Sequence, residues 1–145
     1  MRVNQCASFQ ADFPDDAIEN DEGFVEFGGH GVAGAIGEFL TRLGCKVSEP
    51  INAGEHGWEL DVEIDRRHLW CQVTDVVDYM ILVFEDQSAI DKVLKRYDAV
   101  YIDTIKKLNL ALNADERFHD VKWHAEGIDP SPSSPHTLSP VIDEG

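Results

Sequence analysis

Alternating apolar and polar positions mark the middle of the chain as a β-hairpin. From Trp58 onwards apolar residues occur at every second position up to Ile64, and acidic residues fill the positions between them. After Arg66-Arg67 the alternation resumes over residues 68–74. A period of two is typical of a strand with one buried and one solvated face. The pattern therefore predicts two antiparallel strands joined by a turn at the arginine pair.

The register of this hairpin follows from keeping its apolar side chains on one face. A loop centred on Arg66-Arg67 would pair Ile64 with Leu69, Val62 with Cys71 and Leu60 with Val73. On the opposite face it would pair Glu63 with Trp70, Asp61 with Gln72 and Glu59 with Thr74. A slip of one residue would turn half of the apolar side chains into water, so it is disfavoured.

Hydrophobic residues at helical spacing predict two helices around these strands. The first covers about residues 30–43 and ends before Gly44, where a left-handed backbone costs least. The second begins at Ser88, with Asp91 as a capping carboxylate, and runs to about residue 112. Further strands are expected at 24–27, 45–49, 79–84 and, less regularly, 118–123, with 79–84 central and covered on both sides. This order predicts an α+β fold, an antiparallel sheet of four to five strands with both helices on one face.

Length and composition indicate one domain. With 145 residues and 43% hydrophobic residues, the chain can bury a single core. We expect this core in residues 23–124, a loosely ordered acidic arm in 1–22 and a flexible, Pro- and Ser-rich tail in 125–145. There is no apolar run of membrane-spanning length and no secretory leader pattern. Cys6, Cys45 and Cys71 form no CxxC pair, which suits free thiols in a reducing cytoplasm.

Net charge narrows the range of partners. The chain carries 28 acidic residues against 12 Lys and Arg, a formal charge of −16. Nucleic acids and anionic membrane surfaces both require a cationic face. We therefore expect neither as a partner.

The most informative charged feature is a ladder of acids on one face of the first hairpin strand, Glu59, Asp61, Glu63 and Asp65. Neighbouring carboxylates in such a ladder stand about 6.6 Å apart. They repel by roughly 0.6 kcal/mol per pair in water. One interpretation is the ordinary wet face of a sheet in an acidic protein. The other is a docking surface for a basic protein, with Trp70 and either Met80 or Phe84 as apolar anchors.

The docking interpretation predicts a protein-interaction module without catalytic activity or cofactor. An immunity protein or inhibitor that binds a cationic toxin or nuclease would use such a face. Type III secretion chaperones are similar in size, acidity and rough element order. Asp91, Lys95 and Lys107 make the predicted second helix near neutral on its outer side, so homodimerisation through this helix remains open.

A glycine cluster supports an alternative function. Gly29, Gly31 and Gly34 form a G-x-G-x-x-G sequence between a predicted strand and helix, and Glu49 lies 20 residues after Gly29. This segment resembles the first unit of a Rossmann fold, which implies a nucleotide-binding module or a small enzyme. In that family the glycines approach a pyrophosphate and the acid holds a ribose hydroxyl. The same small residues would also let the helix pack closely on the sheet.

Two further chemistries have weaker support. Glu38 on the helix and Asp61 on the strand are similar in placement to the acids of PD-(D/E)xK nucleases, but residues 69–74 contain neither the acid nor the lysine of that family. The six histidines lack the H-x3-H and HExxH spacings, so no metal site is predicted.

Overall fold

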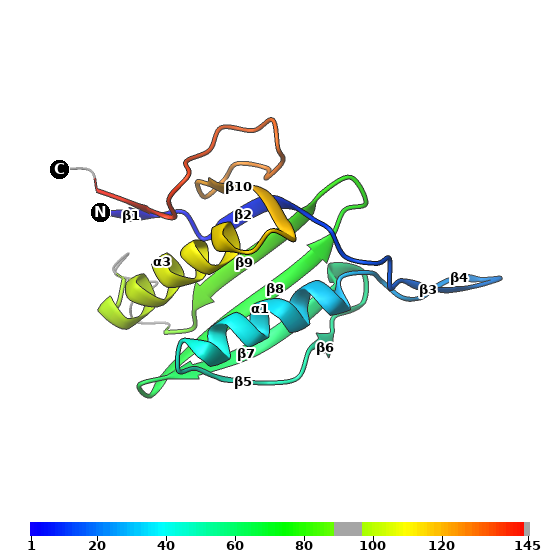
Figure 1. Ribbon diagram of the computed structural model, residues 1–145, viewed down its shortest axis with the longest axis horizontal. Coiled ribbons are helices and arrows are strands. Elements are labelled where there is room, and N and C mark those ends of the chain that lie inside the picture. The colour runs from blue at the N-terminus through cyan, green and yellow to red at the C-terminus, as the bar shows by residue number, and fades with distance from the viewer. Residues whose placement is uncertain (89–96, 144–145) are drawn as a thin grey trace.

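The computed structural model describes residues 1–88 and 97–143. Its main sheet is antiparallel and has seven strands in the order β10-β2-β9-β8-β7-β5, with β6 also paired to β7. Two helices, α1 and α3, lie side by side on one face of this sheet (Figure 1). The α+β class and the helical layer are therefore as predicted, whereas the sheet is larger than the four to five strands expected.

The main sheet consists of β2 (Cys6–Ala11), β5 (Lys46–Val47), β6 (Ile51–Asn52), β7 (Trp58–Ile64), β8 (Arg67–Asp75), β9 (Met80–Asp86) and β10 (Phe118–His124). The helices are α1 (His30–Arg42), α3 (Ala99–Ala114) and the short 3-10 helix η1 (Gly54–His56). Two smaller sheets pair β1 (Arg2–Val3) with β11 (Val141–Ile142) and β3 (Ile18–Asn20) with β4 (Gly23–Glu26). Among the described residues no helix has the length and apolar character needed to cross a membrane.

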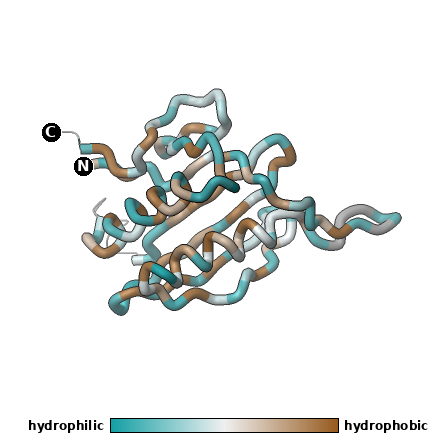
Figure 2. Tube along the Cα trace, viewed as in Figure 1, coloured by the Kyte–Doolittle hydropathy of each residue, from teal (hydrophilic) through white to brown (hydrophobic). Residues whose placement is uncertain are grey.

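The core lies between the helices and one face of the sheet. Helix α1 covers the predicted residues and buries Val32, Ile36 and Leu40 against the strands. Along α1 and α3, hydrophobic positions alternate with hydrophilic ones (Figure 2). Burial of this apolar stripe is what holds the helix on the sheet.

Both ends of the chain differ from the prediction. The predicted loose arm contains β2, which lies between β10 and β9 with Ala7 and Phe9 fully buried. In the predicted flexible tail, Thr137 exchanges two backbone hydrogen bonds with Trp123, and β11 pairs with β1. The bonds to Thr137 satisfy the backbone groups of Trp123 on the outer edge of β10, which would otherwise be part of an open sheet edge.

The hairpin of β7 and β8 keeps its predicted faces, but its predicted register is wrong by two residues. The turn residues are Asp65 and Arg66, with φ values of 49° and 66°. Two left-handed residues in a two-residue loop match the twist of the flanking strands. Ile64 therefore pairs with Arg67, and Asp61 pairs with Trp70. A shift of two leaves every side chain on its original face and changes only its neighbours across the hairpin.

The second helix is shorter than predicted. Helix α3 starts at Ala99, and Asp98 caps it by accepting a hydrogen bond from the Val100 amide at 2.9 Å. Because residues 97 and 98 are not helical, a continuous helix from Ser88 is excluded. The predicted capping acid Asp91 lies outside the described residues.

The strand at 79–84 is central, as predicted, since β9 lies between β2 and β8. Its predicted burial on both sides is wrong. Leu82 and Phe84 are fully buried beneath the helices, whereas Ile81 and Val83 on the other face are only half-buried. In the part of the chain that the structure describes, no helix covers this other face of the sheet.

Candidate functional site

The sheet face that points away from α1 and α3 is called here the back face. Strand alternation assigns its residues, because their neighbours in sequence are buried beneath the helices. On β7, β8 and β9 it carries Glu59, Asp61, Glu63, His68, Trp70, Gln72, Thr74, Ile81, Val83 and Glu85. These residues are half-buried or exposed, and we call this region the open half of the back face.

Trp70 lies at the centre of the open half. Its partner across β7 is Asp61 and its partner across β9 is Glu85, so a carboxylate stands on each side of the indole. Val83, one row away, is the partner of Gln72. A half-buried aromatic ring between acids combines apolar contact area with negative charge, the combination that a basic partner needs.

Three of the four predicted ladder acids share this face. Glu59 accepts a hydrogen bond from Gln72 at 3.3 Å, and Glu63 stands 3.3 Å from the His68 ring. Within residues 1–88 and 97–143, no Lys or Arg forms an ion pair with Glu59, Asp61 or Glu63. Asp65 is not part of the ladder, because it belongs to the hairpin turn. The ladder is thus shorter than predicted. Its carboxylates form no ion pair with a described lysine or arginine, although Lys46 on β5 is the cross-strand neighbour of Glu63.

Sequence reasoning missed the apolar and acidic residues that β9 adds to this face. Residues 79–84 are apolar in both phases, so alternation alone did not show which side chains point away from the helices. The predicted anchors Met80 and Phe84 are wrong, because both are buried beneath the helices. Only the pairing of β9 with β8 places Ile81, Val83 and Glu85 beside Trp70 and Gln72.

The rest of the back face, on β2 and β10, is closed by the C-terminal segment, and we call it the covered half. Pro132 and Pro135 lie over it, because their carbonyl oxygens accept hydrogen bonds from Lys122 and from the His124 ring, each at 2.8 Å. Ser8 is 0% and His124 1% exposed. Polar side chains here are buried and bonded, unlike those of the open half.

His124 has a defined hydrogen-bonding pattern. A carbonyl oxygen can only accept, so Nδ1 donates to Pro135. The Nε2 atom therefore accepts from the Ser8 hydroxyl at 2.8 Å. Burial lowers the pKa of His124, and the nearby positive groups His136 and Lys122 lower it further, although the bond to Pro135 opposes this. The neutral ring thus links β10, β2 and the C-terminal segment.

The glycine cluster lies at the start of α1, but a carboxylate from the same chain occupies it. Asp16 accepts hydrogen bonds from the amides of Gly29 and Gly31 at 2.9 and 2.7 Å. These are the kind of donors that hold a phosphate at a helix N-terminus. Gly34 is half-buried within the helix, and Glu49 is exposed between β5 and β6.

The strands around this glycine cluster also differ from a Rossmann unit. The strand before the glycines, β4, pairs only with β3, and β5 is antiparallel to β7. The structure thus lacks the parallel β-α-β arrangement that the resemblance implied for this segment.

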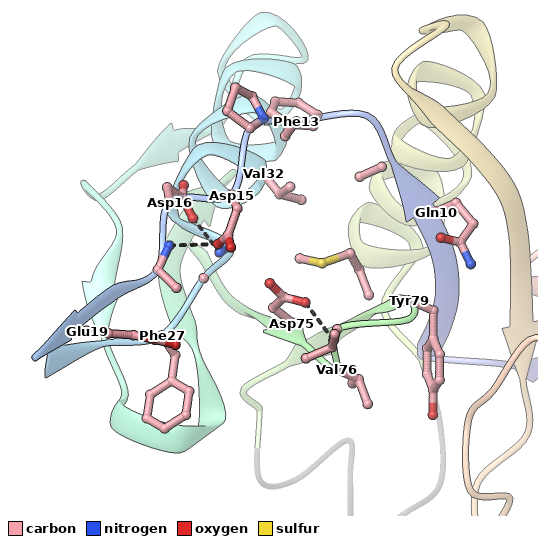
Figure 3. Close-up of a pocket in the computed structure, with 17 residues that line it drawn as sticks. Gln10, Phe13, Asp15, Asp16, Glu19, Phe27, Val32, Asp75, Val76 and Tyr79 are labelled. Atoms are coloured by element: carbon pink, nitrogen blue, oxygen red, sulfur yellow. Dashed lines mark hydrogen bonds between the residues drawn. The ribbon is translucent and has the colours of Figure 1, made fainter. Parts of the chain in front are cut away.

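A pocket of about 530 Å³ adjoins this turn (Figure 3). Asp15 and Asp16 lie on one side of it, Gln10 and Tyr79 on the opposite side, and Asp75 between them. Asp75 Oδ1 accepts a hydrogen bond from the Val77 amide at 2.8 Å. The sequence did not predict this pocket, because its walls come from the start of α1, the chain after β2 and the β8–β9 turn.

The thiols show no sign of nucleophilic activation. Burial raises the pKa of Cys6 to about 11, with Glu85 adding to the effect. Burial also raises the pKa of Cys45 and of Cys71, and all three cysteines are free. A raised pKa lowers the thiolate fraction that would act as a nucleophile. In the described part of the chain, no three His, Cys, Asp or Glu residues are grouped as metal ligands.

Comparison with protein-family models, with curated proteins and with solved structures gave no match.

Proposed function

We propose that this protein is an interaction module that binds a basic protein through the open half of its back face. The observation that carries the proposal is the position of Trp70 between Asp61 and Glu85, beside Glu59 and Glu63. An aromatic anchor within a charged surround is typical of interface hot spots.

The charge of the whole chain supports the same proposal. A net charge of −16 creates a field that attracts a cationic protein from a distance and slows the approach of an acidic one. Asp61 and Glu63 are exposed, and neither forms an ion pair with a described Lys or Arg, although Glu63 stands beside the His68 ring. A cation that approaches Asp61 therefore meets a carboxylate with no described side-chain partner. Complementary fields of this kind raise the association rate and orient the two proteins.

Two kinds of partner fit this chemistry. One is a cationic toxin or nuclease, in which case the protein acts as an immunity protein or inhibitor. The other is a basic secreted protein, in which case it acts as a chaperone for that substrate. In both cases the same residues of this protein make contact. The two cases differ only in what the partner does when it is released.

The test starts with the natural partner. The tagged full-length protein is used to isolate bound proteins from cells that produce it, and we expect a recovered protein with net positive charge. Recovery alone does not support the proposal. The affinity and association rate of the purified pair are therefore measured with variants, and the rate should fall as salt screens the charges.

The decisive variant is Glu59→Lys with Asp61→Lys, which reverses two charges beside Trp70. A matched control, Glu38→Lys with Glu116→Lys, makes the same change in net charge at exposed positions on α1 and after α3. We expect the first variant to weaken binding by about a hundredfold and the control by less than about threefold. Equal losses in both, or no loss in the first, would overturn the proposal.

Trp70→Ala tests the apolar anchor separately from the charge. We expect a loss of about 2 kcal/mol in binding free energy, which is roughly thirtyfold in affinity. Leu110→Ala is the control. Leu110 is 68% exposed on α3, and α3 lies on the side of the sheet opposite the back face. Circular dichroism shows whether each variant is folded.

A further inference from the structure

We propose that the pocket at the start of α1 binds a small ligand that carries an ammonium or guanidinium group on an apolar body. The pocket volume, about 530 Å³, is within the range of about 300–1,000 Å³ typical of small-molecule sites. Its position on the helix side of the sheet separates it from the open half, so this proposal does not depend on the proposed function.

The walls of the pocket provide apolar contact for the body of such a ligand. Val32 and Met80 are buried at its base, and Phe13 and Tyr79 contribute aromatic surface. At its edge Val77 is 88% exposed and has φ = +79°. A left-handed backbone is unusual for a β-branched residue, and the turn nevertheless holds this apolar side chain outward.

The charge of the lining selects the other end of the ligand. The lining contains the four acids Asp15, Asp16, Glu19 and Asp75 and no Lys, Arg or His. An anionic ligand would be repelled, and a neutral apolar ligand would desolvate these carboxylates without compensation. A ligand with a cation on an apolar body can pack against the apolar walls and also pair with the carboxylates.

Asp75 is the residue placed to contact the cation. Both oxygens of Asp16 are used by the amides of Gly29 and Gly31, but only Oδ1 of Asp75 is bonded to an amide. Its Oδ2 has no hydrogen-bond partner among the described residues and lies 2.5 Å from where a Cβ on Gly28 would be. The absence of a side chain at Gly28 thus leaves room for this oxygen beside the pocket.

The experiment is an NMR titration of the full-length protein with phenethylammonium as the probe. We expect saturable shifts of the Gly28, Gly29, Val76 and Val77 amides. Phenethyl alcohol, which lacks the charge, and hydrocinnamate, which reverses it, should bind at least about tenfold more weakly. A blocked phenylalanyl-lysine amide carries the same cation on a peptide, so its affinity relative to phenethylammonium distinguishes a basic protein side chain from a free amine.

Asp75→Asn is the variant that tests the assigned contact. Asparagine keeps the Oδ1 acceptor for the Val77 amide but removes the charge, so the turn is preserved. We expect at least about a tenfold loss of phenethylammonium affinity. Asp78→Asn, in the same turn but outside the pocket lining, is the matched control and should change the affinity by less than about twofold.

Three results would overturn the proposal. They are the absence of saturable shifts at the pocket amides with either cation, equal binding of hydrocinnamate, and equal losses in Asp75→Asn and Asp78→Asn. Because none of these variants changes the back face, failure here leaves the binding of a basic protein by the open half unaffected.

Discussion

Both halves of the back face carry polar residues, but the two halves differ in how those side chains are bonded. In the covered half, the side chains of Ser8, Lys122 and His124 bond to each other or to the C-terminal segment. In the open half, Asp61 has no described side-chain partner, and Glu59 and Glu63 contact only neighbouring side chains. Folding requires the first group, because buried polar atoms must be bonded. The second group meets no such requirement, which is consistent with the binding role that we propose for it.

His124→Ala is expected to have the largest effect on stability. It leaves the Ser8 hydroxyl and the Pro135 carbonyl without their buried partner, and we expect a loss of about 3 kcal/mol in the free energy of unfolding. Urea denaturation measures it. His56→Ala, at an exposed position, should lose less than about 0.5 kcal/mol. If the two variants were equally stable, the bonds of His124 would not be required for folding, and the structural role given to the covered half would be wrong.

Asp16→Ala tests whether folding requires the bonds of Asp16, a carboxylate outside the back face, as it requires those of the covered half. Its two bonds to the start of α1 predict a loss of about 2 kcal/mol. Asp15→Ala is the neighbouring control, since Asp15 is exposed and accepts one bond from the Ala17 amide. We expect less than half of the Asp16 effect there, measured by thermal or urea unfolding. If Asp16→Ala did not change the free energy of unfolding, the amides of Gly29 and Gly31 would not need this carboxylate as a cap.

The pH dependence of stability tests the structural role of His124 in the covered half of the back face. Burial holds the pKa of His124 below its ordinary value of 6.5, so the unfolded chain takes up the proton first as the pH falls. The stabilising contribution is therefore present above pH 6.5 and is lost as the pH falls towards the folded pKa. We expect the free energy of unfolding to differ more between pH 5 and pH 7 in the wild type than in His124→Gln. An equal difference in both would exclude His124 as the cause.

Glu59→Lys with Asp61→Lys is expected to have the smallest effect on stability, within about 0.5 kcal/mol of the wild type. Removing like charges from one strand relieves repulsion, and the hydrogen bond that is lost, from the half-buried Gln72 to Glu59, is long at 3.3 Å. The measurement is urea unfolding beside Glu38→Lys with Glu116→Lys. A loss above about 1 kcal/mol specific to the first pair would show that the ladder serves the fold.

Part of the candidate site could be predicted from local pattern, and part could not. Alternation placed Glu59, Asp61, Glu63 and Trp70 on one face, because a period of two has the same meaning in any sheet. The neighbour of Trp70 depended on the turn. Asp65-Arg66 takes two left-handed conformations without the glycine that usually signals such a turn, so the register was predicted two residues away.

The sequence alone determined the elements whose signal is contained in neighbouring residues. These are the stripe and the Gly44 end of α1 and the two faces of the β7–β8 hairpin. Only the tertiary structure decided that β2 enters the sheet, that the C-terminal segment closes half of the back face and that Asp16 fills the start of α1. Ser8 and His124 are 116 residues apart in the chain. A contact of that separation forms because the fold buries both groups together, and no local pattern of hydrophobic and polar residues records it.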